Sequence, residues 1–179
     1  MYMYMNGNML TMEKGVIAEN SAKSGGTMYV SEATVNINGG EQSRNTANLG
    51  GALYIKKGII DIKGTSFTEN SAVKTASGGN GNGGAVYMSA AVLTTDENTS
   101  FLRNSAENHA GSAYLTYENT TVTKEDNTTE TIREISVLEC NGSLFSENSA
   151  MAGGAVSIRS NCEATFNGAV FTENSAEGH

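Results

Sequence analysis

Four tyrosines recur at one place in a repeated pattern, and they are the side chains in this sequence best suited to binding. Tyr2, Tyr29, Tyr54 and Tyr87 each stand between two apolar residues. Because alternate residues of a strand point to opposite faces, each tyrosine should point away from its apolar neighbours. Exposed aromatic rings favour contact with sugars or a partner protein. The four rings therefore predict a ligand-binding face. The alternative is that they only stack on one another across neighbouring strands and bind no ligand.

Acidic residues offer little for catalysis. Glu147 and Glu173 occupy the same position in two consecutive repeats, which predicts neighbouring carboxylates near the spacing found in retaining glycosidases. A repeated surface glutamate explains the same pair without chemistry. The chain has only three aspartates, at positions 61, 96 and 126. We therefore predict no catalytic residue and no enzyme activity, with a polysaccharide lyase or glycosidase as the alternative.

Neither a cofactor nor a metal is expected. Residues 79–84 read Gly-Asn-Gly-Asn-Gly-Gly, which fits the dinucleotide fingerprint, but that motif needs a helix next and a strand pattern follows. His109 has no Cys or Asp at ligand spacing. Cys140 falls at a position that is apolar in other repeats, and Cys162 lies four residues out of register with it. We expect two free thiols and no disulfide.

Composition excludes two classes of partner. The 179 residues include 21 Gly and no Pro or Trp, and the net charge is −8. Lys and Arg form no cluster, so we expect no nucleic-acid binding. No run of eighteen apolar residues occurs, so no insertion of this segment into a membrane is expected.

The elements that would position the tyrosines come from a phrase repeated six times. Residues 67–72 and 171–176 both read Phe-Thr-Glu-Asn-Ser-Ala, and looser copies surround the other asparagines. The six asparagines are Asn20, Asn45, Asn70, Asn104, Asn148 and Asn174, with gaps of 25, 25, 34, 44 and 26 residues. Self-similarity at this period indicates a chain that stacks on itself. The long gaps place insertions near residues 73–82 and 117–134, the second of which reads as a projecting β-hairpin.

Apolar alternation predicts two strand types in each repeat. One type contains pairs such as Ile60 and Ile62, and the other follows Gly-Gly-Ala, as at Leu53 and Ile55. Tyr114-Leu115 interrupts the second pattern, and no stretch has a period of 3.6 residues. We therefore predict an all-β fold, a right-handed parallel β-helix of about six coils. The six asparagines should form a structural ladder, amide to amide, at left-handed corners of the chain.

The residues before the asparagines give the stacking a further test. They are Glu19, Arg44, Glu69, Arg103, Glu147 and Glu173, and the first five alternate in sign. Opposite charges on neighbouring strands stabilise a sheet, so the alternation favours stacking in register.

The paired motifs resemble the repeat of the polymorphic outer membrane proteins of chlamydiae. Phe67-x-x-Asn70 and Phe101-x-x-Asn104 carry the first motif, and residues 50–53 and 83–86, Gly-Gly-Ala followed by Leu or Val, carry the second. The resemblance implies a β-helical passenger segment of a secreted or autotransported surface protein, commonly an adhesin. It also implies a location at the cell surface, in the outer membrane or outside the cell, and a cell-surface protein or glycan as the partner.

The repeat runs to both ends of the sequence. We therefore expect residues 1–179 to be a single repeat segment of a longer protein, uncapped at both ends. Open strands would then allow end-to-end self-association. Three functions stay open: non-catalytic multivalent binding as an adhesin-like module, a pectate-lyase-like carbohydrate-active enzyme, and a passive structural stalk.

Overall fold

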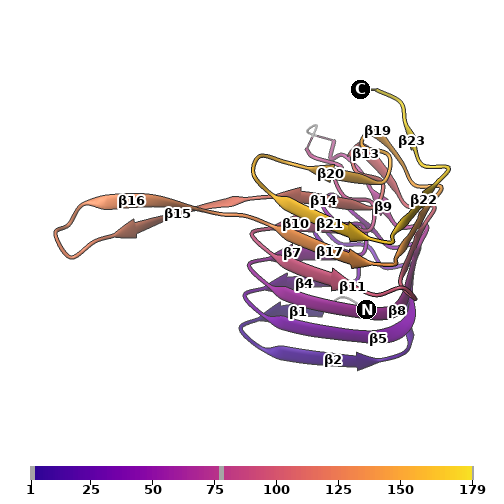
Figure 1. Cartoon of the computed structure of the whole chain (residues 1–179), viewed down its shortest axis with the longest axis horizontal. Coiled ribbons are helices and arrows are strands. Elements are labelled where there is room, and N and C mark those ends of the chain that lie inside the picture. The colour runs from indigo at the N-terminus through magenta and orange to yellow at the C-terminus, as the bar shows by residue number, and fades with distance from the viewer. Residues whose placement is uncertain (1–2, 77–78, 179) are drawn as a thin grey trace.

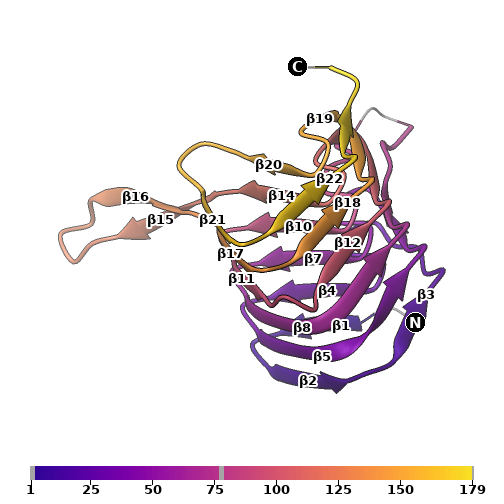
Figure 2. The same cartoon turned by 45° about the vertical axis from the view of Figure 1, so that its right-hand side comes forward.

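The computed structural model describes residues 3–76 and 79–178, and in these residues every regular element is a strand (Figure 1). Three parallel sheets surround a common interior, and one antiparallel hairpin projects from them (Figure 2). No helix of the described residues is long and apolar enough to cross a membrane. The chain is thus all-β with parallel sheets, an arrangement compatible with a parallel β-helix.

Sheet A contains the strands that follow the Gly-Gly motif. In spatial order they are β1 (Met3–Asn6), β4 (Met28–Ser31), β7 (Leu53–Lys56), β10 (Val86–Ser89), β14 (Ala113–Thr116) and β20 (Val156–Ile158). Each strand pairs with its counterpart in the next repeat, so that Leu53 lies beside Val86 and Ile55 beside Met88. The apolar alternation therefore places one face of sheet A inside.

Sheet B carries the longer strands and the Phe motif. Its strands are β2 (Met9–Glu13), β3 (Val16–Ala18), β5 (Thr34–Ser43), β8 (Ile59–Thr68), β11 (Val92–Thr95), β12 (Ser100–Leu102), β17 (Val137–Asn141), β18 (Leu144–Ser146), β21 (Glu163–Asn167) and β22 (Val170–Thr172). Strands β5 and β8 belong to consecutive repeats with no insertion between them. They pair in one register from Thr34 to Ser43, and Gly39 is the one position without a partner in this ladder. The repeats are therefore in register along most of this sheet.

Sheet C is narrow and lies after the asparagines. It contains β6 (Thr46–Ala47), β9 (Ser71–Ala72), β13 (Ser105–His109), β19 (Ser149–Ala152) and β23 (Ser175–Ala176). The remaining pair, β15 (Glu118–Thr123) and β16 (Thr129–Glu134), forms the antiparallel hairpin between sheets A and B. It occupies the segment for which the sequence predicts a projecting hairpin (Figure 1).

The Gly-Gly motif is explained by a close approach between backbones. Gly50 has φ +61°, and a Cβ atom on Gly51 would overlap the carbonyl oxygen of Gly84 and lie 2.6 Å from the amide nitrogen of Ser71. Sheets A and C therefore meet at this corner with no room for side chains. In the fourth repeat Ala110 holds the left-handed position with φ +61°, so the motif there reads Ala110-Gly111-Ser112.

The motif before Tyr114 is thus Ala110-Gly111-Ser112 and not Gly111-Ser112-Ala113, and the predicted interruption of the strand pattern at Tyr114 is wrong. Ala113, Tyr114 and Leu115 pair with Val86, Tyr87 and Met88, so sheet A is not interrupted. Ala113 takes the inward apolar position, and its small size hid the pattern.

The left-handed corner is also displaced from its predicted place. The residue before each asparagine has positive φ, from 51° at Arg103 to 60° at Glu19, whereas the asparagines do not. The bend occurs one residue early because the asparagine side chain must turn inward to reach its hydrogen-bond partners.

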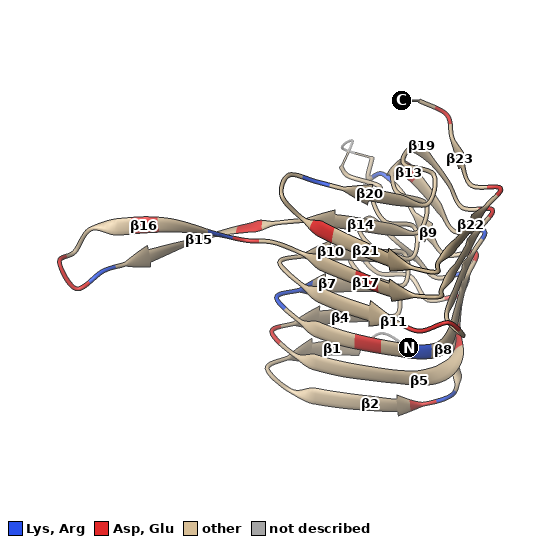
Figure 3. Cartoon of the chain, viewed as in Figure 1, with Lys and Arg blue, Asp and Glu red and all other residues tan. Residues whose placement is uncertain are grey.

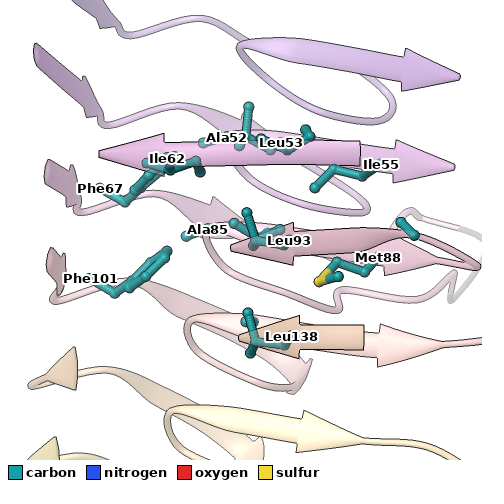
Figure 4. Packing of buried hydrophobic residues seen from close by; sticks show 14 of the residues in the cluster. Ala52, Leu53, Ile55, Ile62, Phe67, Ala85, Met88, Leu93, Phe101 and Leu138 are labelled. Atoms are coloured by element: carbon teal, nitrogen blue, oxygen red, sulfur yellow. The ribbon is translucent and has the colours of Figure 1, made fainter. Parts of the chain in front are cut away.

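The interior is filled by aliphatic side chains and a column of phenylalanines (Figure 4). Phe67, Phe101 and Phe145 are fully buried and stack with ring centroids 5.1 and 4.8 Å apart. Full burial of one such side chain stabilises a fold by about 1.5–3 kcal/mol. Gln42 lies in the same column, between Ile17 and Phe67, and is 1% exposed. It is the one polar residue in this column.

Candidate ligand-binding face

The outer face of sheet A carries a continuous file of five stacked tyrosines. Its members are Tyr4, Tyr29, Tyr54, Tyr87 and Tyr114, and we call them the tyrosine file. Successive ring centroids are 5.3, 4.7, 5.1 and 5.2 Å apart, with interplanar angles of 22° or less. The spacing follows from the strands, because neighbouring strands lie about 4.8 Å apart and hold equivalent side chains above one another.

The structure corrects the membership of this file. Met3, Tyr4 and Met5 pair with Met28, Tyr29 and Val30, so Tyr4 stands where the sequence analysis placed Tyr2. Tyr2 itself lies outside the described residues. The N-terminal segment alternates Met and Tyr, so a shift of two residues leaves the same pattern and the sequence could not fix the register.

Stacking covers the faces between neighbouring rings, and Tyr4, Tyr29, Tyr54 and Tyr87 remain at least partly exposed to solvent. Tyr4 at the end of the file is 62% exposed and Tyr114 is buried, while Tyr29, Tyr54 and Tyr87 are partly buried. Burial raises the pKa of Tyr54 to about 12 and also raises the pKa of Tyr29, Tyr87 and Tyr114. These four phenols hold their protons more tightly than a free tyrosine. A ligand would meet ring edges and neutral hydroxyl groups at the exposed part of the file.

The base of the hairpin borders the tyrosine file. Glu118 at the start of β15 accepts a hydrogen bond from the Ser89 hydroxyl at 2.6 Å and lies 3.8 Å from the Lys56 ammonium. The negative charge of Glu118 also contributes to the raised pKa of Tyr29, Tyr54 and Tyr87. A carboxylate thus stands at one border of the aromatic surface.

A second set of contacts fixes the hairpin to the corner after sheet A. The Lys57 ammonium lies 2.5 Å from the Glu134 carboxylate and donates to the Thr120 hydroxyl at 2.8 Å. Thr120 in turn donates to Glu134 at 2.6 Å. Hydrogen bonding to Lys57 lowers the pKa of Glu134. The two contacts of Lys57 link residues 63 or more apart in the sequence, so no local pattern predicts them.

The six predicted ladder asparagines lie in one file inside the corner between sheets B and C. The Nδ2 group of each donates to the Oδ1 atom of the next at 2.9–3.0 Å, from Asn20 to Asn174. The backbone amide of each donates to the same oxygen at 3.0 Å. The Nδ2 group also donates back to a carbonyl of the preceding repeat, as from Asn104 to Phe67 at 2.9 Å. Their role in this structure is therefore structural.

The residues before the asparagines form ion pairs across repeats. Arg44 lies 3.0 Å from Glu19, and Arg103 lies 3.2 Å from Glu69 and 3.9 Å from Glu147. These side chains are about half exposed or more, so each pair contributes little, about 0–1 kcal/mol. The alternation of sign nevertheless matches the observed pairing.

The other candidates for chemistry do not converge. Glu147 and Glu173 occupy equivalent corners of adjacent repeats, and Glu147 is paired with Arg103. The Gly-rich run at residues 79–84 leads into strand β10, so it lacks the helix that a dinucleotide site needs. His109 lies 5.9 Å from the Tyr114 ring. Cys140 is a buried free thiol and Cys162 a partly buried one.

Residues of both charge signs lie along the strands and the hairpin (Figure 3). Figure 3 shows Lys and Arg positions scattered among Asp and Glu along the strands and at the hairpin tip. Within the described residues, no group of three or more His, Cys, Asp or Glu side chains could hold a metal ion.

Comparison with known families identifies the repeat. Residues 64–89 match the Chlamydia polymorphic membrane protein (Chlamydia_PMP) repeat. This segment of the chain is similar to one repeat of that family. These residues run from the middle of β8 through the Asn70 corner and the Gly-Gly motif to the end of β10. No curated protein and no solved structure matches the chain. Proteins with the polymorphic membrane protein repeat are outer-membrane or surface proteins and are not an enzyme family.

Proposed function

We propose that this chain is a segment of a right-handed parallel β-helix of about six coils that binds a cell-surface partner through the tyrosine file. The observation that carries the proposal is the unbroken stack of five tyrosines on the outer face of sheet A. Parallel crossovers are right-handed in nearly all proteins, which supports the handedness. The repeat family supports a position outside the cell.

The geometry favours a protein over a glycan as the partner. Sugars usually pack on the face of an aromatic ring, but neighbouring rings 4.7–5.3 Å apart cover these faces in the file. The exposed edges and hydroxyl groups are suited to the apolar and hydrogen-bonding contacts of protein interfaces, where tyrosine is enriched. Repetition along a stiff rod would add weak contacts into avidity.

Binding to cultured epithelial cells tests the proposal. Fluorescently labelled protein should bind saturably, and replacing Tyr29, Tyr54 and Tyr87 together by Ser should weaken the binding by about tenfold or more, the loss expected when interface aromatics are truncated. A matched control replaces the exposed apolar residues Ile59 and Val92 of sheet B by Ser. Circular dichroism checks that both variants fold. Equal binding by the tyrosine variant and the wild type would overturn the proposal.

A passive stalk is the second candidate, because mutual stacking also stabilises the sheet without any ligand. Deletion of hairpin residues 118–134 separates the two functions when it is combined with the tyrosine variant. A passive stalk shows no saturable binding as the wild type or as either variant, whereas the binding module binds as the wild type and loses binding in the tyrosine variant. Incubation with pectin and alginate covers the carbohydrate-enzyme alternative, for which appearance of shortened products would be the positive result.

A further inference from the structure

The tyrosine file brings phenols from separate repeats into direct contact. Tyr29 and Tyr54 form the closest pair, with ring centroids 4.7 Å apart and planes 14° from parallel. Tyr54 and Tyr87 are 5.1 Å apart and 5° from parallel. The first pair is separated by 25 residues of sequence and the second by 33. The rings of each pair are therefore nearly parallel and stacked on one another across repeats.

We propose that the tyrosine file is a site of oxidative cross-linking, in which a one-electron oxidant joins neighbouring rings as dityrosine. The oxidant class is a haem peroxidase with hydrogen peroxide. This proposal does not depend on ligand binding and concerns a covalent modification of the same residues.

Coupling of two tyrosines consumes one molecule of peroxide. The oxidant removes one electron and one proton from each of two phenols, and peroxide is reduced to two molecules of water. The two phenoxyl radicals form one carbon–carbon bond between the ring carbons ortho to the oxygens. Each bonded carbon then loses its proton and the oxygen regains one, which restores two phenols. The net change is the loss of two hydrogen atoms from the tyrosine pair.

Two properties of the file favour coupling within the chain. The rings are already in contact, so the local concentration of one radical around its neighbour far exceeds that of a second molecule. Tyr29 and Tyr54 are only partly buried, so their rings have room for the rotation that bond formation requires.

A link between Tyr29 and Tyr54 would staple two consecutive repeats. It closes a loop of about 25 residues, and such a constraint lowers the entropy of the unfolded chain. For a chain of this size, the expected rise in the thermal midpoint is on the order of 5–10 °C.

The test treats the purified protein with horseradish peroxidase and hydrogen peroxide and follows dityrosine fluorescence. Peptide mass spectrometry should then find Tyr29 joined to Tyr54, or Tyr54 to Tyr87, in monomeric protein. Tenfold dilution at a fixed ratio of oxidant to protein should leave the yield per chain unchanged. A yield that falls with dilution, or the absence of cross-linked peptides from the file, would overturn the proposal.

Two conservative variants sharpen the result. Tyr54→Phe keeps an aromatic ring in the stack but should abolish both of these cross-links, leaving only those of Tyr4 with Tyr29 and Tyr87 with Tyr114. Tyr117→Phe is the matched control, because Tyr117 lies outside the file with the Arg133 guanidinium 4.3 Å above its ring. An equal loss of fluorescence in both variants, or no loss in Tyr54→Phe, contradicts the assignment.

Discussion

At the scale of single residues, the asparagine ladder explains why one amide recurs in every repeat. The Oδ1 atom of Asn104 accepts from the amide nitrogen and the Nδ2 group of Asn70, and its Nδ2 group donates to Asn148 and to the Phe67 carbonyl. All of these side chains are fully buried. Buried polar groups are costly unless they are paired, and no other side chain of this size offers two donors and a double acceptor.

Loss of one ladder amide should therefore strongly destabilise the fold. Asn104→Ala removes four hydrogen bonds and leaves the Phe67 carbonyl and the two donors of Asn70 without these partners. We therefore expect the free energy of unfolding to fall by about 3–5 kcal/mol. Urea denaturation measures it. The control is Asn167→Ala, which removes an exposed bond to Asn141 and should cost less than about 0.5 kcal/mol. Similar values for the two variants would contradict the role given to the ladder.

Replacement of Gln42 should raise the free energy of unfolding, in contrast to replacement of Asn104. Both polar atoms of its side chain are buried and have no hydrogen-bond partner, and the residue lies in a column that is otherwise apolar. Gln42→Leu removes this unpaired amide while keeping its volume, so the free energy of unfolding should rise by about 1–3 kcal/mol. A lower urea midpoint for this variant would show that the amide is satisfied in solution.

At the scale of elements, the tyrosine file should make the folding stability of the chain decrease at high pH. Burial and neighbouring charge raise the pKa of Tyr54 from 10.0 to about 12, so the folded state holds its proton more tightly than the unfolded state. The resulting stabilisation is complete below about pH 10 and is lost as the pH rises through about 12.

Urea midpoints measured from about pH 9 to 12 check this dependence. The wild type should lose stability across the range, and Tyr54→Phe should lose less because its ring has no proton to release. Lysines also titrate in this range, so the difference between the two proteins is the informative quantity. Identical slopes would mean that Tyr54 titrates as in an unfolded chain.

At the scale of the whole molecule, the sequence was sufficient for the positions that repeat and failed where the repeat is imperfect. The Phe and Asn columns were predictable because each position must satisfy the same burial and hydrogen bonding in every level. Tyr4 and Tyr114 were missed because Met-Tyr alternation is ambiguous by two residues and Ala113 does not look like a core residue. The hairpin anchors of Lys57 depend on contacts between distant residues, which no local pattern encodes.

The unpaired edges of the outermost strands lead us to expect end-to-end association between molecules. Strands β1–β3 at one end and β20–β23 at the other each have a neighbour on one side only within the described residues. Light scattering should show an average mass that grows with concentration, because such edges pair with one another. Val170→Lys places a charge on edge strand β22 and should reduce the growth, whereas Ile59→Lys on inner strand β8 should not. A constant monomer mass for the wild type would contradict this prediction.

The stacking of consecutive repeats in register is the central claim, and engineered disulfides test it most directly. Asn36 and Asp61 are partners in adjacent parallel strands, where Cα atoms lie about 4.8 Å apart, within the range of a disulfide. In a Cys162→Ser background, the pair Asn36→Cys with Asp61→Cys should oxidise readily to an intramolecular disulfide. The pair Asn36→Cys with Lys63→Cys, two residues out of register and about 8 Å apart, should not. Equal oxidation of both pairs, or a bridge only in the second, would contradict the stacked arrangement.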